Sequence, residues 1–125
     1  MHDWRGGGTI LIVDDEETVR TVSRAMVSHM GFKVLTAADG REAISSLRQS
    51  ADEVVCVLLD LYMPHMDGER AFHEMVKIKP DIRIILSSGI NMLDTANRFA
   101  AKRPVGYLQK PYDLEELKQV LMTTP

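Results

Sequence analysis

The length, composition and charge of the chain are those of one globular domain. Its 125 residues allow one domain with a real core but not two ordinary ones, and 45% of them are apolar. The net charge of −3 does not favour nucleic acid or an anionic membrane as a partner, and no apolar run approaches the roughly 20 residues of a membrane span. Because the start has no apolar signal-peptide region and Cys56 is the single cysteine, we expect a cytoplasmic domain without disulfides.

Short β-type runs alternate with helical patterns after a glycine-rich lead-in over residues 1–8, which we expect to be flexible. The predicted strands are, in chain order, Thr9–Val13, Lys33–Ala37, Val54–Leu59, Ile82–Ser87 and Val105–Leu108. Apolar residues spaced three and four apart predict a helix after each strand, over Val19–Met30, Ala43–Leu47, Ala71–Ile78, Leu93–Ala100 and Leu114–Leu121. We expect the domain to cover residues 9–122 and a short tail to cover 123–125.

Local signals support these helix boundaries. Asp39 before Glu42, and Asp113 before Glu116, are typical of capping boxes, in which side chains satisfy the free N–H groups of a helix start. Gly31 is an expected stop for the first helix. Regular βα alternation, with several strands apolar throughout, predicts an α/β domain: a doubly wound parallel sheet with helices on both faces. In such sheets the ligand site lies beyond the carboxyl ends of the strands.

Polar residues stand at those strand ends. They are Asp14 and Asp15 after the first strand, Asp60 after the third, Ser87 and Ser88 at the end of the fourth, and Lys110 after the fifth. Three acids at close quarters repel one another unless a cation joins them. Mg²⁺ suits such a site because it binds through few carboxylates and shares its shell with phosphate oxygens, and Mn²⁺ is an alternative of the same kind.

The same strand ends offer groups that recognise a phosphoryl group. Lys110 supplies a point charge and Ser88 a hydroxyl donor, so the set indicates phosphoryl transfer, with a carboxylate as the acceptor. An aspartate pair standing alone would more often be a solvated helix start, where acids favour the helix dipole. Because Asp60 and Lys110 stand at matching strand ends, the interpretation of the aspartate pair as a solvated helix start is much weaker here. His29, His65 and His73 share no metal-binding spacing, and we expect them on the surface.

The segments "ILIVDDEE", "LLDLYMPHMDG", "IILSSG" and "GYLQKP", in this order, resemble the receiver domain of two-component response regulators. The resemblance covers nearly the whole chain, roughly residues 9–121, and is most like receivers attached to hybrid sensor histidine kinases. It implies a flavodoxin-like sheet of five parallel strands in the order 2-1-3-4-5. It also implies phosphorylation by a histidine kinase or histidine phosphotransfer domain, with an unidentified downstream protein reading the result.

The resemblance assigns a role to each matching residue. Asp60 would be the phosphoacceptor, and Asp14, Asp15, Asp60 and the backbone carbonyl of Tyr62 would hold Mg²⁺. Lys110 would pair with the phosphoryl group. Ser88, rather than Ser87, matches the switch hydroxyl by its distance from Lys110, and Tyr107 matches the switch aromatic. The Lys110–Pro111 peptide would be cis.

The chain departs from the common receiver pattern in a few places. Arg103 and Pro104 stand where many receivers have glycine and alanine, so the fourth helix is expected to be short or irregular. Tyr62 and Ile90 are bulky or apolar where polar groups are frequent. They are expected to flank the path of the water that attacks an aspartyl phosphate, which predicts slow self-dephosphorylation.

Two other functions fit parts of the pattern. One is a phosphohydrolase with an aspartate nucleophile on a similar fold, but such enzymes usually place a second acid where this chain has Tyr62. The other is a pseudo-receiver that binds partners without phosphate, which the complete set of strand-end residues argues against. We therefore expect a signalling receiver that catalyses only its own phosphorylation and dephosphorylation.

Overall fold

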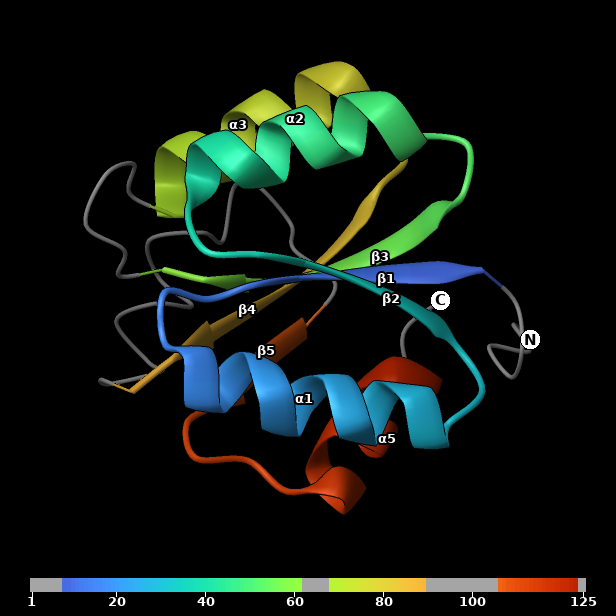
Figure 1. Ribbon diagram of the computed structural model, residues 1–125, viewed down its shortest axis with the longest axis vertical. Coiled ribbons are helices and arrows are strands. Elements are labelled where there is room, and N and C mark those ends of the chain that lie inside the picture. Colours follow the sequence, from blue (N-terminus) through green and yellow to red (C-terminus); the bar gives the residue numbers. More distant parts are fainter. Residues whose placement is uncertain (1–7, 62–67, 90–105, 124–125) are drawn as a thin grey trace.

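A twisted parallel sheet with helices on both faces forms the protein, and the computed structural model describes residues 8–61, 68–89 and 106–123 (Figure 1). The strands are β1 (Thr9–Val13), β2 (Lys33–Ala37), β3 (Val54–Asp60), β4 (Arg83–Ser88) and β5 (Gly106–Gln109). The helices in the described part are α1 (Glu17–His29), α2 (Gly40–Ser50), α3 (Gly68–Ile78) and α5 (Leu114–Thr123). The strand order is β2-β1-β3-β4-β5, as the resemblance implied. The helix predicted over 93–100, with Arg103 and Pro104 beyond it, lies outside the described residues.

Three strands each extend one residue further toward the carboxyl edge than predicted. Prediction ended β3 at Leu59, β4 at Ser87 and β5 at Leu108, but Asp60 pairs in register with Ser87, and Ser88 pairs with Gln109. The backbone ladder therefore continues after the side chains become polar, because main-chain pairing does not depend on side-chain polarity. Asp60 and Ser88 consequently stand on the rigid sheet rather than on loops.

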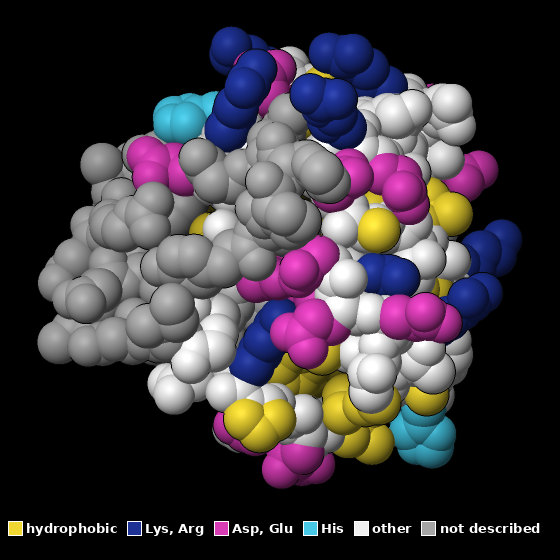
Figure 2. Space-filling view, turned by 60° about the vertical axis from the view of Figure 1, so that its left-hand side comes forward, with side chains coloured by type: hydrophobic (Ala, Val, Ile, Leu, Met, Phe, Trp, Pro, Cys, Tyr) yellow, Lys and Arg dark blue, Asp and Glu magenta, His cyan; other side chains and the backbone are white. Residues whose placement is uncertain are grey.

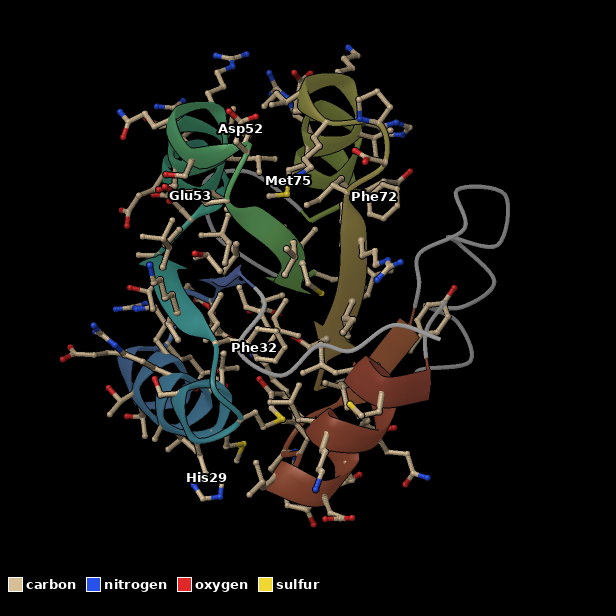
Figure 3. The ribbon with its side chains drawn as sticks, turned by 90° about the vertical axis from the view of Figure 1, so that its right-hand side faces the viewer. His29, Phe32, Asp52, Glu53, Phe72 and Met75 are labelled. Atoms are coloured by element: carbon tan, nitrogen blue, oxygen red, sulfur yellow. The ribbon has the colours of Figure 1, made fainter. Side chains whose placement is uncertain are left out.

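The sheet is buried on both faces, which explains the uninterrupted apolar runs of β1, β3 and β4. Helices α2 and α3 cover one face, and α1 and α5 cover the other (Figure 1). Alternate residues of β1 point to opposite sides, so Leu11 packs in the core under α2 and α3 while Ile12 packs in the core over α1 and α5. Figure 3 places Met75 of α3 on one side of the sheet and Phe32, just after α1, on the other.

The end of α1 has the geometry of a Schellman motif. Gly31 has a φ of 95°, a left-handed conformation that favours glycine, and its N–H donates to the Ser28 carbonyl at 3.0 Å. The N–H of Phe32 donates to the Val27 carbonyl at 3.4 Å, and both side chains join the core over α1 and α5. The predicted stop at Gly31 is confirmed, and it directs the chain straight into β2.

Both predicted N-caps form, and the cap of α5 is a complete capping box. The Glu116 N–H donates to Asp113 Oδ1 at 2.8 Å, and the Asp113 N–H donates back to Glu116 Oε1 at 3.2 Å, so the cap of α5 is fixed at Asp113, three residues after Lys110. In α2 the Glu42 N–H donates to Asp39 Oδ1 at 2.9 Å, but the return bond reaches the N–H of Ala38 rather than that of Asp39. Within the described ranges, none of the helices combines the length and apolar character needed to cross a bilayer.

Candidate phosphoryl-transfer site

The strand-end residues predicted from the sequence lie together at the carboxyl edge of the sheet. Oxygen atoms of Asp14, Asp15 and Asp60 all lie within 4.8 Å of one another. Asp14 and Asp60 are only 2% and 3% exposed, whereas Asp15 is exposed. Figure 2 brings this edge forward and shows acidic side chains gathered there, with an apolar patch beside them. Two buried carboxylates beside a third require compensating positive charge.

Lys110 supplies positive charge to this cluster. Its Nζ lies 2.6 Å from Asp14 Oδ2 and 3.3 Å from Asp60 Oδ2, and its side chain is 14% exposed. The more exposed Glu16 places its Oε1 atom 3.8 Å from Lys110 Nζ. Burial by itself lowers the pKa of Lys110, but hydrogen bonds to Asp14 and Asp60 and the charges of both outweigh it, so the pKa of Lys110 is raised. The ammonium is therefore charged at neutral pH.

The backbone around Asp14 is fixed by α1. The Glu16 N–H donates to Asp14 Oδ1 at 2.9 Å, which leaves Oδ2 to meet Lys110. The guanidinium of Arg20 donates to the Asp14 carbonyl at 2.7 Å. Sequence reasoning gave Arg20 no role, because a basic residue in the first turns of a helix carries no signal of such a contact. The structure shows that α1 holds in place the turn that carries Asp14 and Asp15, which we call the acidic turn.

A glycine holds the segment after Asp60 close to the sheet. The Leu61 N–H donates to the Ser87 carbonyl at 3.1 Å, and the Gly68 N–H donates to the Leu61 carbonyl at 2.9 Å. A Cβ atom on Gly68 would lie 2.5 Å from Leu61 Cα and 3.0 Å from the Asp60 carbonyl oxygen. In the sequence, the motif containing Gly68 served to indicate the family resemblance, and this close approach was missed.

Ser88 and Tyr107 occupy neighbouring strands. Ser88 is fully buried, and its carbonyl accepts the Lys110 N–H at 2.8 Å. Tyr107 pairs in register with Leu86 and packs against the core under α2 and α3, where burial raises its pKa. Because side chains alternate along a strand, Ser88 lies on the same face as Leu86 and therefore on the face of Tyr107. The Lys110–Pro111 peptide is cis, as the resemblance implied.

The donor set fits a hard divalent cation. Carboxylate oxygens are the protein ligands that Mg²⁺ uses, usually few in number, with water and phosphate oxygens completing its shell. Asp14 and Asp60 are buried and would hold one side of the ion, whereas Asp15 is exposed and lies on the side that faces solvent. The Tyr62 carbonyl, expected as a further ligand, lies outside the described residues, as does Ile90.

Comparison with known proteins shows the family. The model of the response regulator receiver domain matches residues 10–122, and the chain belongs to this family. It is therefore a receiver domain of the two-component type, as the sequence motifs indicated.

Two curated relatives show how differently such domains are used. The chain is 36% identical over 115 residues to the sensor kinase CckA of Brucella abortus (strain 2308), which covers 92% of this chain but 12% of that protein. It is also 36% identical over 114 residues to the DNA-binding transcriptional regulator NtrC of Azospirillum brasilense, covering 90% of this chain and 23% of the relative. The chain thus spans less than a quarter of each of these relatives.

One solved structure connects this fold to a metal and a phosphoryl analogue. It is the CheX-CheY-BeF3-Mg+2 complex from Borrelia burgdorferi, to which the chain is similar with a TM-score of 0.84 and 28% identity. The match covers 93% of this chain and 87% of that one. In that relative, by its description, a magnesium ion and a beryllium fluoride accompany a domain of the same fold.

Substituting Gly68 tests the close approach behind Asp60. Gly68→Ala is expected to lower the free energy of unfolding by about 1–3 kcal/mol, because the added methyl meets backbone atoms that cannot move aside easily. Gly89→Ala is the matched control, since a Cβ there meets nothing within 4 Å. Urea denaturation measures both variants. Equal stability of the two would contradict the packing role of Gly68.

Magnesium is expected to stabilise the folded chain, because the three carboxylates come together only after folding. At 100 times its dissociation constant, Mg²⁺ should raise the free energy of unfolding by about 2.7 kcal/mol in urea titrations. Asp15→Ala should remove this effect, whereas Glu17→Gln, exposed at the start of α1, should keep it. If Mg²⁺ left the free energy of unfolding of the parent chain unchanged, the metal site would be disproved.

Proposed function

We propose that the domain receives a phosphoryl group on Asp60 from a histidine kinase or histidine phosphotransfer domain. The observation that carries the proposal is the Lys110 ammonium, placed between the buried carboxylates of Asp14 and Asp60. A cation beside an acceptor carboxylate is suited to the phosphoryl group that arrives there. The same position would hold the acceptor in place before transfer.

The transfer is a displacement at phosphorus. An Asp60 oxygen attacks the phosphorus atom, the bond from phosphorus to the donor's histidine nitrogen breaks, and that nitrogen keeps the electron pair. Lys110 exchanges part of its contact with Asp60 for a contact with a phosphoryl oxygen. A Mg²⁺ ion held by Asp14, Asp15, Asp60 and the Tyr62 carbonyl would neutralise charge on the phosphoryl oxygens, and Mn²⁺ would do the same.

The signal would pass from Ser88 to Tyr107. The added charge, about −1.5 to −2, favours a hydroxyl donor, so Ser88 is drawn toward the phosphoryl group. Tyr107 lies on the same sheet face one strand away and is only partly buried, which leaves its ring space to repack. A switch from 1:99 to 99:1 requires about 5.5 kcal/mol of preference for the active state, which a few charge-assisted bonds supply. The downstream partner reads that repacked surface.

Phosphorylation is the direct test of the proposal. Incubation with Mg²⁺ and acetyl phosphate should add one phosphoryl group to the intact mass of the parent chain. Asp60→Asn should abolish the addition, because an amide oxygen is a far weaker nucleophile than a carboxylate. Asp52→Asn is the control: Asp52 is exposed in the turn before β3, as Figure 3 shows, and labelling should be unchanged. Equal labelling of Asp60→Asn would refute Asp60 as the acceptor.

A groove beside the site is suited to a phosphodonor. It has a volume of about 410 Å³ and lies between α1 and the segment after β5. Its lining is mostly apolar, with Val19, Val22, Met26 and Pro111, and it also includes Lys110. Val22 is 48% exposed and adjoins Val19 and Met26 in the lining, so the exposed apolar surface is a contiguous patch rather than a single side chain. We infer that a helix of the histidine-bearing partner lies along this groove.

The variant Val22→Arg tests whether the groove serves to dock the partner rather than to carry out phosphoryl transfer. Val22→Arg should slow transfer from a phosphorylated histidine partner by about tenfold or more, because a central apolar contact is lost. Its labelling by acetyl phosphate should match the parent, since that donor needs no docking surface. Met122→Arg, on α5 and 43% exposed, is the control and should affect neither rate. Equal slowing with both donors would contradict a docking role.

The cytoplasmic location and the slow loss of the phosphoryl group stay predictions from the sequence. So do the boundaries of the lead-in at residue 8 and of the tail at residue 123.

A further inference from the structure

A hydrogen bond joins α1 to the loop that follows Lys110. The hydroxyl oxygens of Ser23 and Tyr112 lie 2.6 Å apart, although 89 residues separate them in the chain. Ser23 is 1% exposed, and the Tyr112 ring packs against the core over α1 and α5. Burial raises the pKa of Tyr112, so its hydroxyl keeps its proton at neutral pH and remains available to this bond.

Lys110 lies between two anchors of its own loop. On one side its N–H donates to the Ser88 carbonyl at 2.8 Å, which ties the loop to β4. On the other side the Tyr112 hydroxyl ties the loop to α1. The capping box that begins at Asp113 then leads directly into α5. The long stem of Lys110 therefore starts from a backbone that is fixed before and after it.

The same helix also fixes the opposite side of the site. Arg20 binds the Asp14 carbonyl at 2.7 Å, and Ser23 stands three residues further along α1. Residues three apart lie on one face of a helix. One face of α1 therefore holds both the acidic turn and the Lys110 loop, and sets the separation between the carboxylates and the ammonium.

We propose that the Ser23–Tyr112 hydrogen bond positions the Lys110 ammonium for phosphoryl transfer, which makes Ser23 and Tyr112 positioning residues. The proposal rests on the phosphoacceptor function proposed above. Phosphoryl transfer depends on the placement of charge more than on covalent chemistry by the protein. A lysine stem is flexible, so its ammonium is placed only as well as its backbone and contacts are.

Tyr112→Phe is the cleanest variant because it keeps the ring and removes only the hydroxyl. The Ser23 hydroxyl is then able to donate to a carbonyl of the preceding helical turn, so no buried polar group is left without a hydrogen bond. Ser23→Ala removes the other partner, and Ser23→Thr keeps a hydroxyl at the same place. Ser28→Ala, on an exposed part of α1, is the matched control.

The first measurement is the rate of phosphorylation by acetyl phosphate at saturating Mg²⁺. Tyr112→Phe and Ser23→Ala should each lower it by about 3- to 10-fold, the usual range for one hydrogen bond. Ser23→Thr and Ser28→Ala should stay near the parent, and the Mg²⁺ dissociation constant should not change. Parent-like rates in Tyr112→Phe would overturn the proposal. Failure of the parent itself to label would instead refute the proposed function.

The second measurement asks whether Tyr112 acts through Lys110. In a Lys110→Ala background, which is already slow, Tyr112→Phe should cause no further loss of rate, because the group it positions is gone. A purely structural role of Tyr112 would slow both backgrounds by the same factor. That outcome would overturn the proposal.

The third measurement needs neither metal nor phosphodonor. In the metal-free protein, amide hydrogen exchange of the Lys110 N–H should be faster in Tyr112→Phe than in the parent, because one anchor of the loop is lost. Ser28→Ala should leave it unchanged. Parent-like exchange at Lys110 in Tyr112→Phe would show that the hydrogen bond does not order this loop, and would overturn the proposal.

Discussion

The crowding of carboxylates at one edge of the sheet is the constraint on which the rest of this structure depends. Asp14 and Asp60 are buried, and an unpaired buried charge is costly. Lys110 compensates both with contacts of 2.6 and 3.3 Å, yet a third acid, Asp15, remains beside them. Three carboxylates against one ammonium leave an excess of negative charge where a metal ion and a phosphoryl group are expected.

The parallel sheet makes such crowding tolerable. Burial on both faces fixes β1, β3 and β4 with two apolar cores, and the paired backbone continues through Asp60 and Ser88. Gly68 lets the chain return close to Asp60. Stability is supplied by the core, so the edge is free to hold groups that oppose folding. This separation is typical of open α/β sheets, where function gathers at the carboxyl ends of the strands.

Helix α1 links the parts of the site. Its first turns bind the acidic turn through Arg20, its middle holds the Lys110 loop through Ser23, and its exposed side forms the groove that contains Val22. A partner helix in that groove would lie against the element that sets the spacing of the reacting groups. The proposed docking surface and the reacting groups are therefore held by the same helix.

The sequence by itself determined the alternation of strands and helices, the caps at Asp39 and Asp113, and the meeting of acids with Lys110 at one edge. These follow from local periodicity, and from the rule that parallel strands end on one side. Only the tertiary structure decided that Gly68 must lack a side chain, that Arg20 holds the Asp14 carbonyl, and that Ser23 meets Tyr112. Each of these contacts joins residues whose types fit many other settings, and the partner is chosen by how the helices pack on the sheet.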